Sequence, residues 1–541
     1  MNRKIMSIIL CLGLFIIPAF VNAEVNLQSE TKAGIFEGEK KDYKATSLTI
    51  SDYDPLVDIS VTVDIKKIRS LEKNNRMINF EENIDSFSNP DFYVRVTIND
   101  EQFTSQVWKN TRYIEDCPFS ATLNVPDDEQ FVDIKIELWD HNIGLDKRCD
   151  ISNLHFDSER LKDSFDVDLI YDIKTGHWRG DDFNYDEQVS ADVSGYGRLN
   201  GCDDGSAYEE ERDVELWFDI YQTDYDQDGI PYWTEKNVYG TNPKVDDRGR
   251  DDDNDGVPIE WEWKFGHKYS SWGNEDIWFY DPFEWEDHQN MDIDEDGLDN
   301  VEEYLTWQWG SDPFRKDIFM EIDQMEIGPN GEGTHLPELS KDLLKTAYRR
   351  QNIVLHIDDG CFGGGQTDIP FDEDTTDQEL KQIYHDYFLN GDKDYWRKGV
   401  FHYTLLPYHS DRYPGFVFRG DDQLDCCQIS MRPHQQIPTR LPILFRFYWK
   451  NMNMEEIHAT VYAGAIMHET GHTLGIFHSN TPGCDDQIGK KPWHLHFWKW
   501  HNYKSVMNYA YVYRMVDYSD GSRGRNDFDD WDRIDLTLFQ D

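Results

Sequence analysis

The 541-residue sequence predicts a multidomain protein with an N-terminal all-β sandwich, an acidic repeat segment and a C-terminal α+β domain. The chain is too long for one ordinary hydrophobic core, so several domains are expected. Short alternating apolar runs fill residues 47–223, and an Asp-rich template recurs over residues 224–315. Alternating strand and helix patterns begin at residue 316 and continue towards residue 541.

The first 23 residues have the composition of a secretory signal peptide. Arg3 and Lys4 precede an apolar run over 5–20, and Val-Asn-Ala at 21–23 matches a cleavage pattern of small residues. Because the apolar run is short for a membrane span of about 20 residues, a cleaved signal is favoured over a retained anchor. We therefore expect a secreted protein, either released or held at the cell surface, with a polar linker over 24–46.

Acidic residues outnumber Lys and Arg by 106 to 53, which gives a formal net charge of −53. A surface of this sign repels nucleic-acid phosphates, so nucleic acid is excluded as a partner and divalent cations are favoured.

The sequence contains eight cysteines, of which Cys11 would leave with the signal peptide. The remainder is an odd number, so they cannot all pair within one chain, and an exported chain meets oxidising conditions in many cells. The candidate disulfides are Cys117–Cys149 and a pairing of Cys361 or Cys484 with Cys426 or Cys427.

The N-terminal region, residues 47–223, is predicted to be an antiparallel sandwich because runs such as FYVRVTI at 92–98 and FVDIKIELW at 131–139 alternate in polarity. Two of its loops are acidic, and this arrangement is similar to the conserved-region-two domain of protein kinase C. The resemblance implies calcium binding, and in some relatives lipid contact, through Asp85, Asp91, Asp140 and Asp146. The alternative is a structural sandwich with solvated acidic loops.

The segment 224–315 carries one template in three copies: DYDQDGIPYWTE from 224, DDDNDGVPIEWE from 251 and DIDEDGLDNVEE from 292. Calcium prefers six to eight oxygen ligands, which alternate carboxylates, a glycine turn and a closing glutamate supply. The predicted calcium ligands are Asp224, Asp226, Asp228, Glu235, Asp251, Asp253, Asp255, Glu262, Asp292, Asp294, Asp296 and Glu303.

With the tails YGTNPKVDD and WGSDPFRKD, the first and third copies resemble thrombospondin type 3 repeats. The second copy departs from them, because a Trp- and Glu-rich insert at 269–289 follows its loop. The resemblance implies a calcium-stiffened spacer that resists proteolysis.

In the C-terminal region, strands are predicted at 316–325 and 352–360, a helix at 337–351, and a long helix from Asn453 to Gly475. On the long helix His468 and His472 are one turn apart and project from one face. Gly475 can adopt positive φ, end the helix and return His478 to the same ion.

Three histidine nitrogens with an open fourth position suit a catalytic zinc ion, which lowers the pKa of a bound water to about 7. Glu469 lies beside the ligands, where it can take a proton from the attacking water and pass it to the leaving group.

The pattern HETGHTLGIFH at 468–478 and the later SVMNYAY at 505–511 resemble the metzincin clan of zinc peptidases. The resemblance implies that Met507 packs beneath the histidines and that Tyr509 assists the oxyanion. It also implies that residues 490–504, rich in Trp and His, wall a specificity pocket. Ser479 departs from astacins, which place Glu after the third histidine, so the resemblance holds for the clan rather than for one family.

The sequence therefore predicts a secreted zinc endopeptidase acting on proteins or peptides, with catalytic Zn²⁺ and structural Ca²⁺. The alternative is a calcium-stabilised adhesive or binding protein at the cell surface, with an inactive peptidase domain. The oligomeric state does not follow from the sequence.

Overall fold

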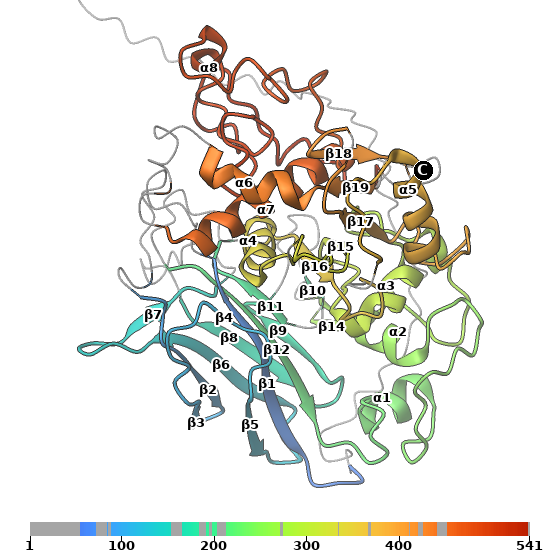
Figure 1. Ribbon diagram of the computed structural model, residues 1–541. Coiled ribbons are helices and arrows are strands. Elements are labelled where there is room, and N and C mark those ends of the chain that lie inside the picture. The colour runs from blue at the N-terminus through green and yellow to red at the C-terminus, as the bar shows by residue number, and fades with distance from the viewer. Residues whose placement is uncertain are drawn as a thin grey trace, which may run out of the picture. The chain divides into compact units, whose positions relative to one another are not determined.

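Antiparallel strands form the N-terminal part of the computed structural model, in two sheets that share one hydrophobic core (Figure 1). The first sheet has the order β11-β12-β1-β4, with β5 also paired to β1, and the second has the order β3-β2-β6-β8-β9, with β7 paired to β6. The strands are β1 (Ser60–Ser70), β2 (Phe92–Ile98), β3 (Glu101–Thr104), β4 (Tyr113–Ile114), β5 (Phe119–Asn124), β6 (Phe131–Asp140), β7 (Lys147–Cys149), β8 (Val167–Asp172), β9 (His177–Gly180), β11 (Gly197–Asn200) and β12 (Val214–Gln222).

The structure describes residues 55–71, 84, 88–152, 165–182, 191–193, 197–202, 212–270, 274–333, 335–365, 369–410, 412–419, 426–440, 449 and 452–538. The predicted signal peptide at 1–23, the linker at 24–46 and Asp85 lie outside these residues. The described residues belong to one compact unit, Ala45–Asp541.

The repeat segment contains short helices between its acidic loops and one small antiparallel sheet of order β10-β13-β14. The insert after the second loop supplies the end of β13 and all of β14, and the sandwich region supplies β10. The elements are β10 (Ala191–Val193), α1 (Tyr232–Thr234), η2 (Glu235–Tyr239), α2 (Ile259–Phe265), β13 (His267–Ser270), β14 (Glu275–Trp278), η3 (His288–Asn290), α3 (Asn300–Thr306) and η4 (Trp307–Trp309).

The C-terminal part is built on a sheet of order β16-β15-β17-β19-β18, in which β18 alone is antiparallel to its neighbour. Every residue of β15 is buried, as expected for a parallel strand covered on both faces. The elements are β15 (Asp317–Gln324), α4 (Glu338–Arg349), β16 (Val354–Asp358), α5 (Asp377–Ile383), η5 (Tyr384–Phe388), β17 (Phe401–Leu406), β18 (Gly415–Phe418), β19 (Cys426–Ile429), α6 (Met431–Arg440), α7 (Met454–Thr473) and α8 (Leu495–Lys499).

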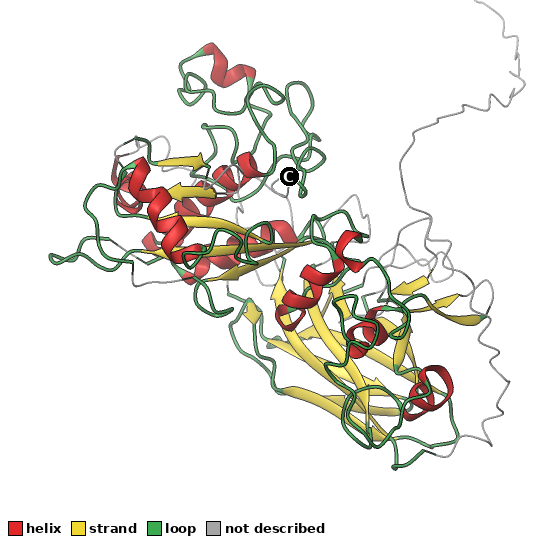
Figure 2. Cartoon of the chain, turned by 90° about the vertical axis from the view of Figure 1, so that its right-hand side faces the viewer, coloured by secondary structure: helices red, strands yellow, loops and turns green. Residues whose placement is uncertain are grey.

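Two hydrophobic clusters cover this sheet. One joins Met320 and Ile322 of β15 to residues of α4 and α7, and the other joins Phe319 of β15 to residues of α5 and η5. Loops and turns make up most of the chain beyond α7, as Figure 2 shows. No described helix is long and apolar enough to cross a membrane.

The chain folds into several sheets with some helices, which agrees with the predicted multidomain organisation, and the predicted strands at 92–98 and 131–139 are β2 and β6. The metzincin-like fold of residues 316–541 stays a prediction. The helix predicted from Asn453 is α7, and Asn453 forms a capping box with Glu456. The predicted domain boundaries stay predictions.

The disulfide prediction is wrong for this structure. No disulfide joins any of the described cysteines, which are Cys117, Cys149, Cys202, Cys361, Cys426, Cys427 and Cys484. Cys117 and Cys149 both lie in the sandwich core, where they pack as small apolar side chains. Burial raises the pKa of Cys117 to about 12, so the thiol stays protonated.

Candidate metal centres

The helix α7 brings two predicted zinc ligands together. His468 and His472 lie one turn apart, with ring centroids separated by 4.9 Å. The Nδ1 atom of His468 lies 2.9 Å from the Val506 carbonyl oxygen, and Nδ1 of His472 lies 2.7 Å from that of Ile476. A carbonyl only accepts, so each Nδ1 carries the proton and each Nε2 presents a lone pair.

The turn after α7 has the predicted backbone geometry. Gly475 has φ of +89°, and its amide donates to the His472 carbonyl at 3.2 Å. His478 follows on the returning chain, and its Nδ1 donates to the Cys484 carbonyl at 2.9 Å. His478 therefore has the same protonation pattern as the two helix histidines, with Nε2 available to a ligand.

Asp485 was missed by the sequence reasoning. Its carboxylate contacts Nε2 of His468 at 3.2 Å and Nε2 of His472 at 3.4 Å. Zn–N and Zn–O bonds of about 2.0–2.2 Å put neighbouring ligands of a tetrahedral site roughly 3.4 Å apart, so these distances fit one shared ion. Asp485 has φ of +58° and donates from its backbone to the Met507 carbonyl.

Glu469 is 8% exposed and faces the edge strand β18. A Cβ atom placed on Gly415 of β18 would lie 2.6 Å from Oε1 of Glu469. Burial raises the pKa of Glu469, and the neighbouring His468 and His472 act in the opposite direction by lowering it. The carboxylate is therefore shielded from bulk water and lies directly against a sheet edge.

Met507 and Tyr509 both border the histidines. A Cβ on Gly471 would lie 2.5 Å from Sδ of Met507, which is fully buried, so Met507 packs against α7 between the two histidine turns. The ring of Tyr509 stacks on that of His468 at 5.3 Å. Burial and then the Asp485 charge raise the pKa of Tyr509, so its hydroxyl keeps its proton.

The three acidic loops share one hydrogen-bond pattern. The first Asp of each accepts from the glycine amide, at 3.1 Å in the first loop, 3.3 Å in the second and 3.0 Å in the third. The residue before the third Asp of each loop has positive φ: Gln227 at 70°, Asn254 at 63° and Glu295 at 59°. The loops are therefore geometric repeats as well as sequence repeats.

The carboxylates of these loops fit a bound cation. The acidic groups of the first loop lie within 4.8 Å of one another, as do the three aspartates of each later loop. The same two positions of every loop carry buried oxygens that have no hydrogen-bond partner, and buried carboxylates normally have one. These oxygens belong to Asp226, Asp253, Asp294, Glu235, Glu262 and Glu303.

The acidic loops of the sandwich are different. Asp140 accepts from the Asp91 backbone at 2.9 Å and from the Asn142 side chain at 2.7 Å. Asp146 accepts from the Asn142 backbone and from the Tyr93 hydroxyl at 2.9 Å. These carboxylates are already engaged in hydrogen bonds, so calcium and lipid binding by the sandwich stay predictions.

No protein-family model and no curated protein matches the chain. Among solved structures, human GIVD cytosolic phospholipase A2 aligns over 32% of this chain and 17% of its own, with 12% identity and a TM-score of 0.18. A structure of a C2 domain aligns over 30% of this chain and 98% of its own, with 10% identity and a TM-score of 0.17. One domain of plant Extended Synaptotagmin 1 aligns over 31% of this chain and 98% of its own, with 12% identity and a TM-score of 0.16. The chain thus spans under a fifth of the phospholipase. TM-scores and identities as low as these support no conclusion about function.

Proposed function

We propose that the protein is an exported zinc endopeptidase that hydrolyses peptide bonds in proteins. The observation that carries the proposal is the convergence of two carbonyl-anchored imidazoles, His468 and His472, beside the buried carboxylate of Glu469. The metzincin resemblance makes His478 the third ligand in place of Asp485, so that the fourth position stays open to water. A zinc ion held there supplies an acidified water and polarises a carbonyl.

The neighbouring sheet edge supports a peptide as substrate. Among the described strands, β18 pairs only with β19, which leaves its other edge open. An extended peptide can add to such an edge through main-chain hydrogen bonds, whatever its side chains. Because Gly415 of β18 lies against Glu469, a peptide on this edge would carry its backbone past the base.

The chain's own residues account for the proton transfers. Glu469 accepts the proton of the attacking water, and burial makes its carboxylate a stronger base by raising its pKa. The same carboxyl then gives the proton to the leaving amine. Tyr509, whose hydroxyl stays protonated, donates a hydrogen bond to the carbonyl oxygen as negative charge develops.

Replacing the base tests this proposal. Glu469→Gln keeps the shape of the side chain but removes the proton acceptor, so we expect kcat on a denatured protein substrate to fall by about 10²–10⁴. The zinc content of the purified protein should not change. Glu455→Gln, an exposed glutamate in the first turn of the same helix, is the matched control and should cleave as wild type does. If the wild-type protein binds zinc but cleaves no substrate, the peptidase proposal is wrong, and the alternative of a calcium-stabilised adhesive or binding protein is favoured.

We further propose that the acidic loops bind structural cations, with calcium as the ion of the first and third loops. The support is the set of buried, unpartnered carboxylate oxygens at two matching positions of each loop.

A further inference from the structure

The insert at 269–289 folds back onto the second acidic loop. Its Glu286 donates from the backbone to Oδ2 of Asp255 at 3.2 Å. The corresponding oxygens of Asp228 and Asp296 accept from Asp247 and Asp317. The insert therefore closes the second loop in the way that the tails close the other two.

The tails of the first and third loops also supply a hydroxyl to the closing glutamate. Thr241 donates to Glu235 at 3.3 Å, and Ser311 donates to Glu303. The sequence after the second loop contains no such tail, and a different set of groups surrounds Glu262. Asp255, Glu262, Glu286 and His288 each offer one ligand atom, and these atoms lie within 4.8 Å of one another.

His288 is fully buried and directs Nε2 at these carboxylates. Its Nε2 lies 3.3 Å from Asp255 and 3.8 Å from Glu286, and it has no hydrogen-bond partner. The rings of Trp261 and Tyr280 meet the imidazole edge-on, with centroids 5.8 Å and 4.8 Å away. The imidazole therefore packs against two aromatic rings and is fully shielded from solvent.

The other ring nitrogen contacts Asn300, whose Nδ2 lies 2.8 Å from Nδ1. The oxygen and nitrogen of this amide exchange places by a half-turn. With the oxygen facing Nδ1, His288 donates from Nδ1 and its Nε2 lone pair points into the cluster. Oδ1 of Asn300 then also accepts from the Tyr280 hydroxyl, while Nδ2 takes the buried, unpartnered position that Oδ1 held.

We propose that Asp255, Glu262, Glu286 and His288 form a second transition-metal site, of the zinc class, in the repeat segment. Imidazole is a ligand for zinc and its neighbours, whereas calcium takes six to eight oxygens. Three carboxylates and one imidazole provide the four ligands of a tetrahedral ion. The second repeat differs from the other two in metal preference, and the insert causes the difference.

Metal counting on the full-length protein tests the site independently of peptidase activity. Wild type, His288→Gln and Glu286→Gln are loaded with zinc and calcium, freed of excess metal, and analysed for both metals per chain. The same variants are made with His472→Ala, which weakens the proposed catalytic site. In both backgrounds we expect His288→Gln and Glu286→Gln to lose one zinc per chain and to keep their calcium.

Replacing the fully buried His288 can unfold the protein. Glu286→Gln then still tests the site, because the Glu286 side chain is 24% exposed and its replacement disturbs the core less. Glu284→Gln, an exposed glutamate two residues earlier, is the control and should bind as wild type does. Equal zinc in wild type and both variants would overturn the proposal. A loss of calcium in place of zinc would overturn it too, since the cluster would then belong to the calcium loop.

Discussion

At the residue scale, the contact between Met507 and Gly471 sets how closely the chain beneath α7 approaches the histidines. Truncating the fully buried Met507 to alanine should cost about 2–5 kcal/mol of unfolding free energy, because it leaves a cavity. Met454→Ala, at an exposed position of the same helix, should change stability by less than about 0.5 kcal/mol. Urea unfolding measures both.

A double mutant makes the same prediction sharper. Gly471→Ala alone adds a methyl group 2.5 Å from Sδ of Met507, so overpacking should destabilise the protein. In the Met507→Ala background the methyl group enters the cavity instead. The two changes should therefore destabilise less together than the sum of each alone, and strict additivity would show that Met507 does not pack here.

The sequence predicted those site residues whose positions follow from local spacing along the chain. His468 and His472 share a face because four residues make about one helical turn, and Gly475 was recognised because its turn needs positive φ. Asp485 and His288 could not be found in this way. Tertiary folding brings Asp485 to its cluster from a turn and His288 from the short helix η3, and no local pattern marks either position.

At the scale of one loop, the metal-free carboxylates repel one another. Burial, together with the charges of Asp228, Asp226 and Asp224, raises the pKa of Glu235 from 4.5 to about 9. A group whose pKa is raised by folding binds its proton more tightly in the folded state. In the presence of chelator, the contribution of Glu235 to the free energy of unfolding should therefore be complete below about pH 4.5. This contribution should fall as the pH rises towards 9.

Calcium should remove this pH dependence, because the ion replaces the proton. With calcium present, unfolding of the repeat segment should lose the decline between pH 4.5 and 9, and binding at pH 7 should release a proton. Calorimetry in two buffers of different ionisation enthalpy measures that release. Glu235→Gln imitates the protonated group, so its stability in chelator should vary less with pH. An unchanged slope would contradict the assignment.

The elements themselves were largely predictable. Strands such as β6 alternate strictly in burial, and α7 begins with a capping box, so local pattern and final structure agree. The insert at 269–289 could not be placed, because its hairpin pairs with β10, a strand far earlier in the chain. The disulfide prediction failed for a related reason, because the separation of two cysteines in the sequence does not give their distance in the fold.

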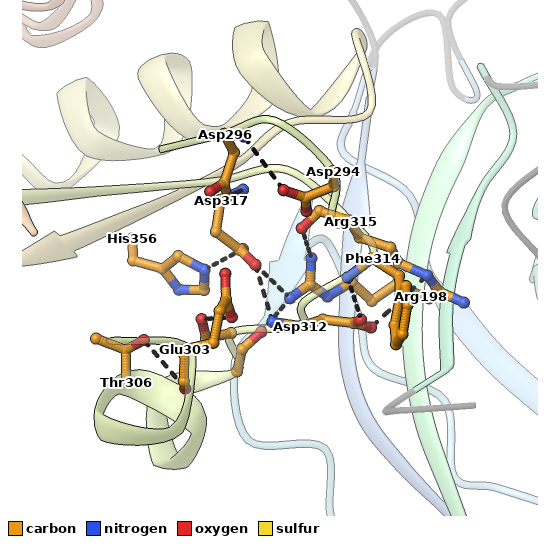
Figure 3. A network of polar contacts seen from close by, with 12 residues as sticks. Arg198, Asp294, Asp296, Glu303, Thr306, Asp312, Phe314, Arg315, Asp317 and His356 are labelled. Carbon is orange, nitrogen blue, oxygen red and sulfur yellow. Dashed lines mark hydrogen bonds and ion pairs between the residues drawn. The ribbon is translucent and has the colours of Figure 1, made fainter. Parts of the chain in front are cut away.

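At the scale of the whole molecule, Asp317 joins three regions of the chain (Figure 3). Its backbone amide, at the start of β15, donates to Asp296 of the third loop at 2.6 Å. Its carboxylate accepts from Arg198 of β11 at 2.9 Å and lies 2.6 Å from Nε2 of His356 on β16. Burial acts to raise the pKa of Asp317, but Arg198 and His356 outweigh it and hold that pKa low.

This network makes the third calcium loop part of the support for the candidate catalytic sheet. In the first loop the corresponding oxygen, Oδ2 of Asp228, accepts instead from the backbone of Asp247, which lies within the repeat segment. Asp294 and Asp226 occupy the same position of the template, and both carry buried, unpartnered oxygens. Replacing either with Asn should weaken calcium binding at its own loop.

The consequences of the two substitutions should differ. Asp294→Asn should loosen the anchor of β15 and lower the temperature at which the proposed peptidase activity is lost. Asp226→Asn should raise protease sensitivity around the first loop while activity survives heating as in wild type. Residual activity after heating, with and without calcium, compares the two variants directly. Equal thermal inactivation would mean that calcium in the third loop does not support the sheet through Asp317.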